Sequence, residues 1–197
     1  MARLVARLLA AVWLFSGAAG AVPVQWTVGS GGNGHFYEFV AQTGLSWTQA
    51  DTAATGAGGY LATVTSAAEQ AFLESLPKAS GSYWAGGQDV ASEGVWRWVT
   101  GPEAGDQFFG PGTPAGAYEN FLAGQPSNSS GGEDYLVFNQ NSGGAGWNDV
   151  SIANSTVKGY VLEIVPEPGT AGLLAVGLFG LAARARRARS GAGARHT

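Results

Sequence analysis

Apolar and polar residues alternate with two different periods along the chain, and the first half contains two helix starts. Ser46 with Gln49, and Ser66 with Glu69, each place a hydroxyl at an N-cap and an amide or carboxylate three residues later. We expect the first helix to end near residue 55, before the glycines at 56, 58 and 59. The second should start at residue 67 and end near residue 76, because Pro77 cannot continue a helix.

After Pro77 the period changes to two, which is typical of strands. Short stretches rich in Val, Tyr, Trp and Phe are bounded by turn residues. These predicted strands cover residues 60–64, 83–86, 95–99, 135–138 and 159–164. The tryptophans in and near them are expected to pack in the core: Trp84, Trp96, Trp98 and Trp147.

Between the later strands, residues 101–132 are mostly Gly, Pro, Ser and Asn with isolated aromatics. A loop of this length inside a compact domain is uncommon and is usually functional. The order of elements predicts an α+β domain with two helices and short antiparallel strands, in which the long loop carries the function.

Both ends of the chain carry targeting features. Residues 1–21 have a basic start, an apolar run and small residues ending at Ala21, which predicts a secretory signal peptide. Residues 166–197 have Pro166-Glu167-Pro168, an apolar stretch at 169–183 and an arginine cluster. As a helix that stretch would span roughly 22 Å of a hydrocarbon core of about 30 Å, with the arginines on the cytoplasmic side.

The three parts of this C-terminal segment together resemble the PEP-CTERM sorting signal of Gram-negative bacteria. The resemblance implies an exosortase substrate, processed near Pro166, Glu167 and Pro168. It also implies a short transmembrane helix that anchors the chain transiently in the inner membrane before release or attachment outside it. An ordinary single-pass anchor is the alternative. Residues 22–165 are then the exported domain.

Charge is distributed unevenly along the 197 residues, whose total is −4. Most basic residues lie in the two ends, and residues 22–165 contain three basic residues against thirteen acidic ones, a net charge of −10. Such a domain repels nucleic acid and suits divalent cations or neutral ligands. The absence of cysteine excludes a disulfide framework and thiol-dependent metal sites.

Oxygen donors gather in and after the long loop. Gln125-Pro126-Ser127-Asn128 is followed by Glu133-Asp134 and then by Trp147-Asn148-Asp149, while Asp89 and Glu93 form a further group before a predicted strand. Hard cations choose such oxygens, and calcium takes six to eight of them. Calcium is therefore the predicted cofactor.

From about residue 35 to 164 the chain resembles the C-type lectin-like domain family. The segments that carry the resemblance are residues 44–50, 59–66, 83–87, 94–101 and 159–164, together with the oxygen-rich motifs above. The resemblance implies that fold, and a principal calcium and sugar site formed by Gln125, Ser127, Glu133, Asn148 and Asp149. Among these, the implied metal ligands are Gln125, Glu133, Asn148 and Asp149. An auxiliary calcium site would use Asp89, Glu93, Asn128, Glu133 and Asp134.

The chain departs from the family pattern at three positions. Ser127 replaces the Asn or Asp that contacts both calcium and sugar, Asn128 replaces an Asp, and Tyr135 stands where a cysteine is usual. The long loop must then be held by packing or by calcium. A Gln-Pro triplet in this family favours galactose-like sugars, and we expect a calcium affinity of about 10⁻⁴ to 10⁻³ M, as in extracellular modules.

These observations predict an exported, calcium-dependent carbohydrate-binding protein, associated with the cell surface or the extracellular matrix and binding a carbohydrate or exopolysaccharide. The alternative is a non-catalytic adhesion or matrix protein that binds protein through the same fold, with calcium structural or absent.

Catalysis is not expected. Glu133 and Asp134 are adjacent, and adjacent residues on a strand point to opposite faces, whereas glycoside hydrolysis needs two carboxyls about 5 to 9.5 Å apart across a sugar. His35 lies far from the acidic group in sequence and is expected to be structural, and the sequence has no Ser/His/Asp arrangement, phosphate loop or zinc signature.

Overall fold

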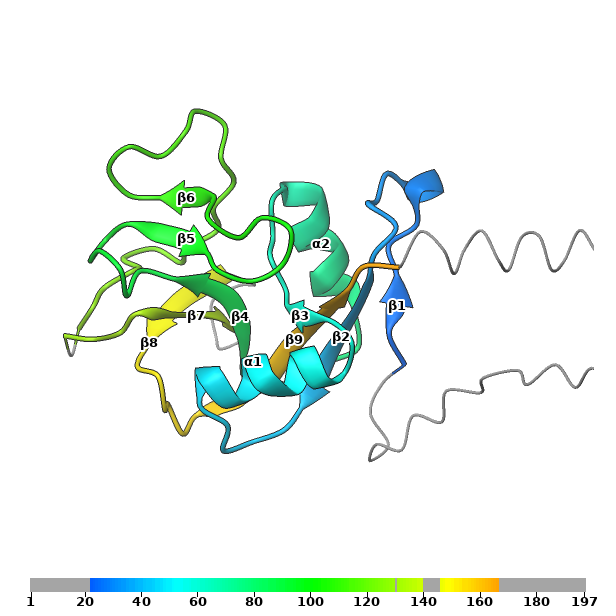
Figure 1. The fold of residues 1–197 in the computed structure, drawn as a ribbon, viewed down its shortest axis with the longest axis horizontal. Helices are drawn as coiled ribbons and strands as arrows, with labels where there is room; N and C mark the ends of the chain where they lie inside the picture. Colours follow the sequence, from blue (N-terminus) through cyan, green and yellow to red (C-terminus); the bar gives the residue numbers. More distant parts are fainter. Residues whose placement is uncertain (1–21, 130, 140–145, 167–197) are drawn as a thin grey trace, which may run out of the picture.

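A computed structural model describes residues 22–129, 131–139 and 146–166 of the chain. These residues form a sheet with two α-helices packed against it (Figure 1). In chain order the elements are β1 (Val24–Gln25), a 3-10 turn η1 (Val28–Ser30), β2 (Phe36–Ala41), α1 (Trp47–Gly56), β3 (Tyr60–Leu61), α2 (Ala67–Ser75), β4 (Ser82–Gln88), β5 (Trp96–Trp98), β6 (Gln107–Phe109), β7 (Tyr135–Asn139), β8 (Gly146–Val150) and β9 (Val157–Ile164).

The sheet has the order β1-β2-β9-β4-β5-β6, and β3, β7 and β8 branch from this path. Strand β3 pairs with β9, β7 pairs with β4, and β8 pairs with β7. Among the described strands, the pairing of β4 with β9 is parallel and the other pairings are antiparallel. The predicted α+β class is confirmed, and the parallel pairing adds a crossover that the sequence did not predict.

The two helices begin where the sequence predicted, but their caps differ. At α1, Ser46 Oγ accepts the Gln49 N–H at 3.2 Å and Gln49 Oε1 accepts the Ser46 N–H at 2.9 Å, so the capping box is complete. At α2, Ser66 Oγ accepts the Glu69 N–H at 3.1 Å. The Glu69 carboxylate instead accepts the Thr65 N–H at 2.8 Å. The predicted box at α2 is therefore half formed, because Glu69 is drawn inward to other partners.

The four tryptophans predicted to be core residues are buried. The exposed fractions of Trp84, Trp96, Trp98 and Trp147 are all 2% or less. Trp147 lies in β8, and its indole N–H donates to Gln70 Oε1 of α2 at 3.0 Å. This tryptophan therefore joins the sheet to the helix that packs near it.

The long loop is held by aromatic packing and backbone hydrogen bonds. Phe108, Tyr118 and Phe121 each place a ring centroid 5.6 to 5.8 Å from that of Trp147. The Leu122 N–H donates to the carbonyl of Trp147 at 3.0 Å, and the Trp147 N–H donates to that of Asn120 at 2.8 Å. The expectation that packing holds the loop is confirmed, and the loop also contains β6, which the sequence did not predict.

The predicted targeting segments lie outside the described residues. Residues 1–21 and 167–197, with Glu167, Pro168 and the apolar stretch at 169–183, are not described, and Pro166 is the last residue that is. Within residues 22–129, 131–139 and 146–166, no helix is both long and apolar enough to cross a membrane.

Candidate ligand-binding site in the long loop

The loop runs back along strand β8 and brings two of the predicted ligand motifs together. The N–H of Asn128 donates to Asp149 Oδ2 at 2.6 Å, across 21 residues of sequence. The Gln125 N–H donates to the Leu122 carbonyl at 2.8 Å, and the peptide bond between Gln125 and Pro126 is cis. Because Leu122 is bonded to β8, the segment from Gln125 to Asn128 lies beside Asn148 and Asp149.

A tight turn after Pro126 adds Glu133 to this group. Asn128 has a φ of 44°, in the left-handed region that Asn tolerates better than most residues. Its Oδ1 accepts the N–H groups of Gly132 at 2.7 Å and Glu133 at 3.2 Å. Glu133 Oε2 in turn accepts the N–H and the hydroxyl of Ser129, both at 2.8 Å. The side chain of Asn128 therefore holds the turn together.

Three oxygens of the predicted calcium ligands are enclosed without a hydrogen-bond donor among the described residues. They are Gln125 Oε1, Asn148 Oδ1 and Asp149 Oδ1. The Asn148 amide nitrogen already donates to the Asp149 carbonyl at 3.0 Å, which leaves its oxygen as the free group. A buried acceptor without a donor costs about 1–3 kcal/mol, so such atoms call for an ion or ordered water. The donor set therefore fits a hard cation such as calcium.

Ser127 contributes differently from its neighbours. Its side chain is exposed, whereas Gln125, Asn148 and Asp149 are wholly or partly buried. A short exposed hydroxyl lies at the edge of the group, where the family pattern has a longer Asn or Asp side chain.

The residues predicted for a second metal site are partly assembled. Asp89 is buried, its Oδ2 accepts the Gly94 N–H at 2.8 Å, and its Oδ1 is enclosed without a donor. Burial, together with the nearby carboxylates of Glu93 and Asp134, raises the pKa of Asp89 to about 6. The Asp89 N–H also donates to the Asp134 carbonyl at 3.2 Å. The side chain of Asn128, which was also predicted for this site, is hydrogen-bonded within the turn described above.

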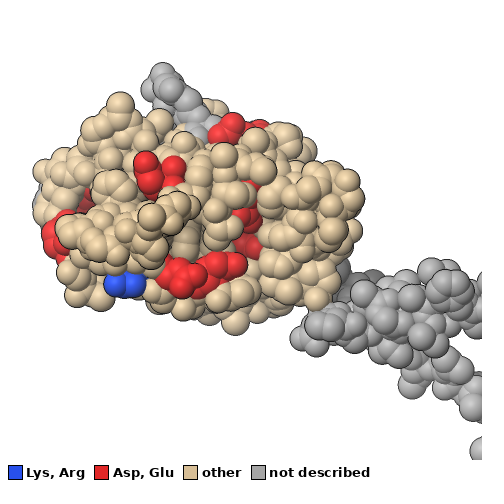
Figure 2. All heavy atoms as spheres, turned by 90° about the horizontal axis from the view of Figure 1, so that it is seen from above, with Lys and Arg blue, Asp and Glu red and all other residues tan. Residues whose placement is uncertain are grey.

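Acidic side chains outnumber basic ones in the domain. Figure 2 shows a face on which Asp and Glu lie at several places and basic side chains appear only near one edge, as the charge of the domain predicts. Within the described part of the chain, no group of three or more His, Asp and Glu side chains could hold a metal ion. The principal candidate site has two carboxylates, of Glu133 and Asp149, and two amides, of Gln125 and Asn148. It therefore does not contain three such side chains.

A second buried polar cluster was not predicted. Glu69 of α2 and Glu163 of β9 are 2% and 1% exposed, and the Tyr37 hydroxyl lies 2.5 Å from one carboxylate and 2.9 Å from the other. His35 Nδ1 lies 2.6 Å from Glu163 Oε1, which raises the pKa of His35. We call Glu69 and Glu163 the buried carboxylate pair. The prediction that His35 is structural agrees with this contact, but only the fold brings together residues 128 positions apart.

Comparison with known families identifies the domain. The family described as "Lectin C-type domain" matches residues 43–160, more than half of the chain, and a second family described as "PEP-CTERM protein-sorting motif" matches residues 165–187. The chain therefore belongs to the C-type lectin domain family and carries a PEP-CTERM motif at its C-terminal end. Both predicted resemblances are confirmed. Membership in a family of non-catalytic binding proteins also confirms that the chain is not an enzyme.

Individual relatives match about two thirds of this chain. Halomucin of Haloquadratum walsbyi is 35% identical over 137 residues, which cover 66% of this chain and 1% of halomucin. Ladderlectin of Oncorhynchus mykiss is 32% identical over 128 residues, which cover 63% of this chain and 60% of ladderlectin. The chain thus spans less than two thirds of either protein.

Solved structures share the fold. The C-type lectin CEL-I from Cucumaria echinata is 29% identical with a TM-score of 0.52, over 68% of this chain and 91% of CEL-I. The cow carbohydrate-recognition domain of CD23, solved in the presence of an oligosaccharide, is 24% identical with a TM-score of 0.53, over 68% and 89% of the two chains. A calcium-independent type II antifreeze protein is 21% identical with a TM-score of 0.51, over 74% and 95%. At these low identities, the CD23 domain and the antifreeze protein show only that the fold is shared.

Proposed function

We propose that this chain is an exported, calcium-dependent carbohydrate-binding protein. The observation that carries the proposal is the set of three enclosed oxygens, on Gln125, Asn148 and Asp149, that no donor in the described residues satisfies. A cation bound by these side chains would satisfy their oxygens, and Glu133 would add a second carboxylate from the adjoining turn. The two carboxylates balance the charge of a divalent ion.

Each residue has a definite part in this proposal. Bound calcium would supply open coordination positions for a pair of sugar hydroxyls. The amide oxygens of Gln125 and Asn148 are neutral ligands, and Asp149 is fixed in place by the Asn128 N–H at 2.6 Å. The Gln125-Pro126 sequence supports a galactose-like ligand. Because the Ser127 side chain is short, most contacts with the sugar would come from Gln125, Glu133, Asn148 and Asp149.

The alternative function is adhesion to protein, with calcium structural or absent. Ser127 favours it, because an exposed hydroxyl is a weaker ligand for both calcium and sugar than the usual Asn or Asp. The fold tolerates this use, since one structural neighbour is described as calcium-independent.

The C-terminal motif supports export and sorting. We propose that an exosortase processes the chain near Pro166, Glu167 and Pro168 after transient anchoring in the inner membrane, leaving residues 22–165 at the cell surface or in the extracellular matrix. The intact mass of the exported protein tests this. Loss of the arginine tail is expected, and a retained tail would indicate an ordinary membrane anchor.

A glycan array with calcium or with chelator tests the binding function. The protein should retain galactose-like or other glycans only with calcium, and Asp149→Asn should lose this retention because it removes one anionic ligand. Asp51→Asn, on α1, is the matched control and should behave as the wild type. Retention of a protein ligand but of no glycan would favour the adhesin instead.

A further inference from the structure

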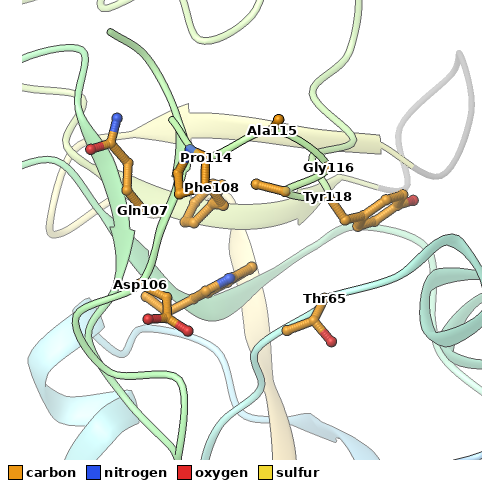
Figure 3. Close-up of a pocket in the computed structure, with 10 residues that line it drawn as sticks. Thr65, Asp106, Gln107, Phe108, Pro114, Ala115, Gly116 and Tyr118 are labelled. Atoms are coloured by element: carbon orange, nitrogen blue, oxygen red, sulfur yellow. The ribbon is translucent and has the colours of Figure 1, made fainter. Parts of the chain in front are cut away.

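A pocket of about 370 Å³ shares no lining residue with the candidate calcium site and lies between the β5–β6 hairpin, the segment 114–118 and the chain entering α2. Figure 3 shows Asp106 and Thr65 on one side of the pocket and Phe108, Pro114 and Tyr118 on the other. Its volume lies within the range of about 300–1,000 Å³ that is usual for small-molecule sites.

Two polar groups in the pocket have no partner among the described residues. Trp98 lines the pocket, its side chain is almost entirely buried at 2% exposure, and its indole N–H makes no hydrogen bond there. This N–H is not one of the fully enclosed unpaired atoms, whereas that of Trp96 is, so it remains accessible on a residue that lines the pocket. Asp106 makes no side-chain hydrogen bond or ion pair within the described chain, although its carbonyl accepts the Trp98 N–H at 3.0 Å.

The groups beside these two are already engaged. Gln107 donates to the Pro111 carbonyl at 2.9 Å and accepts from Arg97 at 3.0 Å, which ties this side chain to the hairpin. Arg97 also donates to the Gly105 carbonyl at 2.9 Å. The Thr65 hydroxyl donates to Glu69 Oε2 at 3.1 Å and retains lone pairs that can accept. The pocket therefore offers one free donor, one free carboxylate and an acceptor hydroxyl.

This combination matches a particular ligand chemistry. A sugar hydroxyl is both donor and acceptor, so it can accept from the Trp98 N–H while donating to the Asp106 carboxylate. The Tyr118 ring supplies an apolar wall for the C–H face of a sugar ring. An anionic ligand would be repelled by Asp106, which is exposed, and a purely apolar ligand would leave the Trp98 N–H unpaired.

We infer that this pocket is a second, calcium-independent subsite for one neutral sugar residue of a glycan. The inference rests on the proposed function in its ligand class, but it uses none of the calcium ligands. The two sites are joined through the core, because Trp98 and Tyr118 both pack on the ring of Trp147, the residue before Asn148. A glycan that reached both sites would bind more tightly than one that reached either alone.

The test is a titration of the full-length protein with galactose, glucose and mannose, one at a time, in chelator. The readout is the indole N–H nuclear magnetic resonance signal of Trp98, which is identified by its absence in Trp98→Phe. We expect at least one sugar to shift this signal with millimolar affinity. Asp106→Asn should weaken that affinity by about tenfold, because a neutral amide oxygen replaces the charged acceptor.

A blocking variant keeps the test decisive if Trp98→Phe does not fold. Ala115 is exposed and lines the pocket, so Ala115→Trp should fill it and abolish binding in chelator, while Ala115→Ser should bind as the wild type. Binding in chelator that survives Asp149→Asn but not Ala115→Trp supports the subsite, even if the calcium site fails its own test. No sugar binding in chelator, or binding that Ala115→Trp leaves unchanged, overturns the inference.

Discussion

The molecule contains two groups of acidic and polar side chains whose hydrogen bonding differs sharply. In the buried carboxylate pair, Thr63 N–H donates to Glu163 Oε2 at 3.1 Å and Thr65 N–H donates to Glu69 Oε2 at 2.8 Å. Glu69 Oε1 accepts from the Tyr37 hydroxyl, and Glu163 Oε1 contacts both the Tyr37 hydroxyl and His35 Nδ1. In the loop site, by contrast, three enclosed oxygens have no donor among the described residues.

The difference separates a structural role from a binding role. Acidic residues occur in both groups, so charge and burial alone do not distinguish them. The buried carboxylate pair is satisfied by the protein's own donors and ties α2 to the sheet. The loop site lacks such donors, and we therefore expect its stability, unlike that of the carboxylate pair, to depend on an added cation.

The largest expected effect comes from breaking the satisfied group. Glu163→Gln can replace the carboxylate oxygen that contacts His35 and Tyr37 with an amide N–H, which cannot accept a hydrogen bond. The substitution should lower the free energy of unfolding by about 2–3 kcal/mol. Urea denaturation measures this loss, which should be the same in calcium and in chelator. Glu74→Gln, at an exposed position on α2, is the control and should change stability by less than about 0.5 kcal/mol. A loss confined to calcium would contradict the separation of roles.

The second prediction concerns pH. Burial raises the pKa of Glu69 above its ordinary value of 4.5, so the folded chain holds a proton that the unfolded chain releases. This contribution to stability is complete below pH 4.5 and is lost as pH rises through the raised pKa, with a slope of at most about 1.4 kcal/mol per pH unit.

Glu69→Gln imitates the protonated acid and removes this dependence. The stability of the variant relative to the wild type should therefore rise between about pH 5 and 8, in urea denaturation at a series of pH values across that range. The raised pKa of His35 acts in the same direction above 6.5, and its main cause, the hydrogen bond to Glu163, is present in both proteins. Parallel pH profiles would show that Glu69 is charged in the folded state.

The smallest expected effect is at the turn that carries Glu133. Asn128→Gly keeps the left-handed backbone but removes the oxygen that accepts the Gly132 and Glu133 N–H groups, and should cost about 1 kcal/mol of stability. Asn128→Ala should cost more, since a side chain at positive φ adds about 1–2 kcal/mol of strain. Both variants should also reduce any stabilisation by calcium. If Asn128→Gly keeps the full calcium response, the turn does not position Glu133.

Local patterns predicted local structure well. The capping residue Ser46, the break at Pro77 and the buried tryptophans could be predicted because each depends on neighbours in sequence. Strand β8 was missed because it carries Asn148 and Asp149, which are unusual in strands. The parallel pairing of β4 with β9 was missed because only the fold sets which distant strands meet.

Sequence motifs indicated the residues of the candidate calcium site. They did not indicate the buried carboxylate pair or the pocket. Gln125 and Asp149 belong to short motifs with fixed spacing, and the fold places these motifs together. The buried carboxylate pair and the pocket around Trp98 and Asp106 join residues from separate elements, and no spacing in the sequence indicates them.

The central claim is that the unsatisfied oxygens of the loop site bind calcium, and thermal denaturation tests it most directly. The full-length protein and Asp149→Asn are melted in chelator and in about 5 mM calcium. For a dissociation constant of about 10⁻⁴ to 10⁻³ M, calcium should stabilise the wild type by about 1–2 kcal/mol and leave the variant unchanged. An identical melting temperature with and without calcium in the wild type, or an equal gain in the variant, would contradict the account.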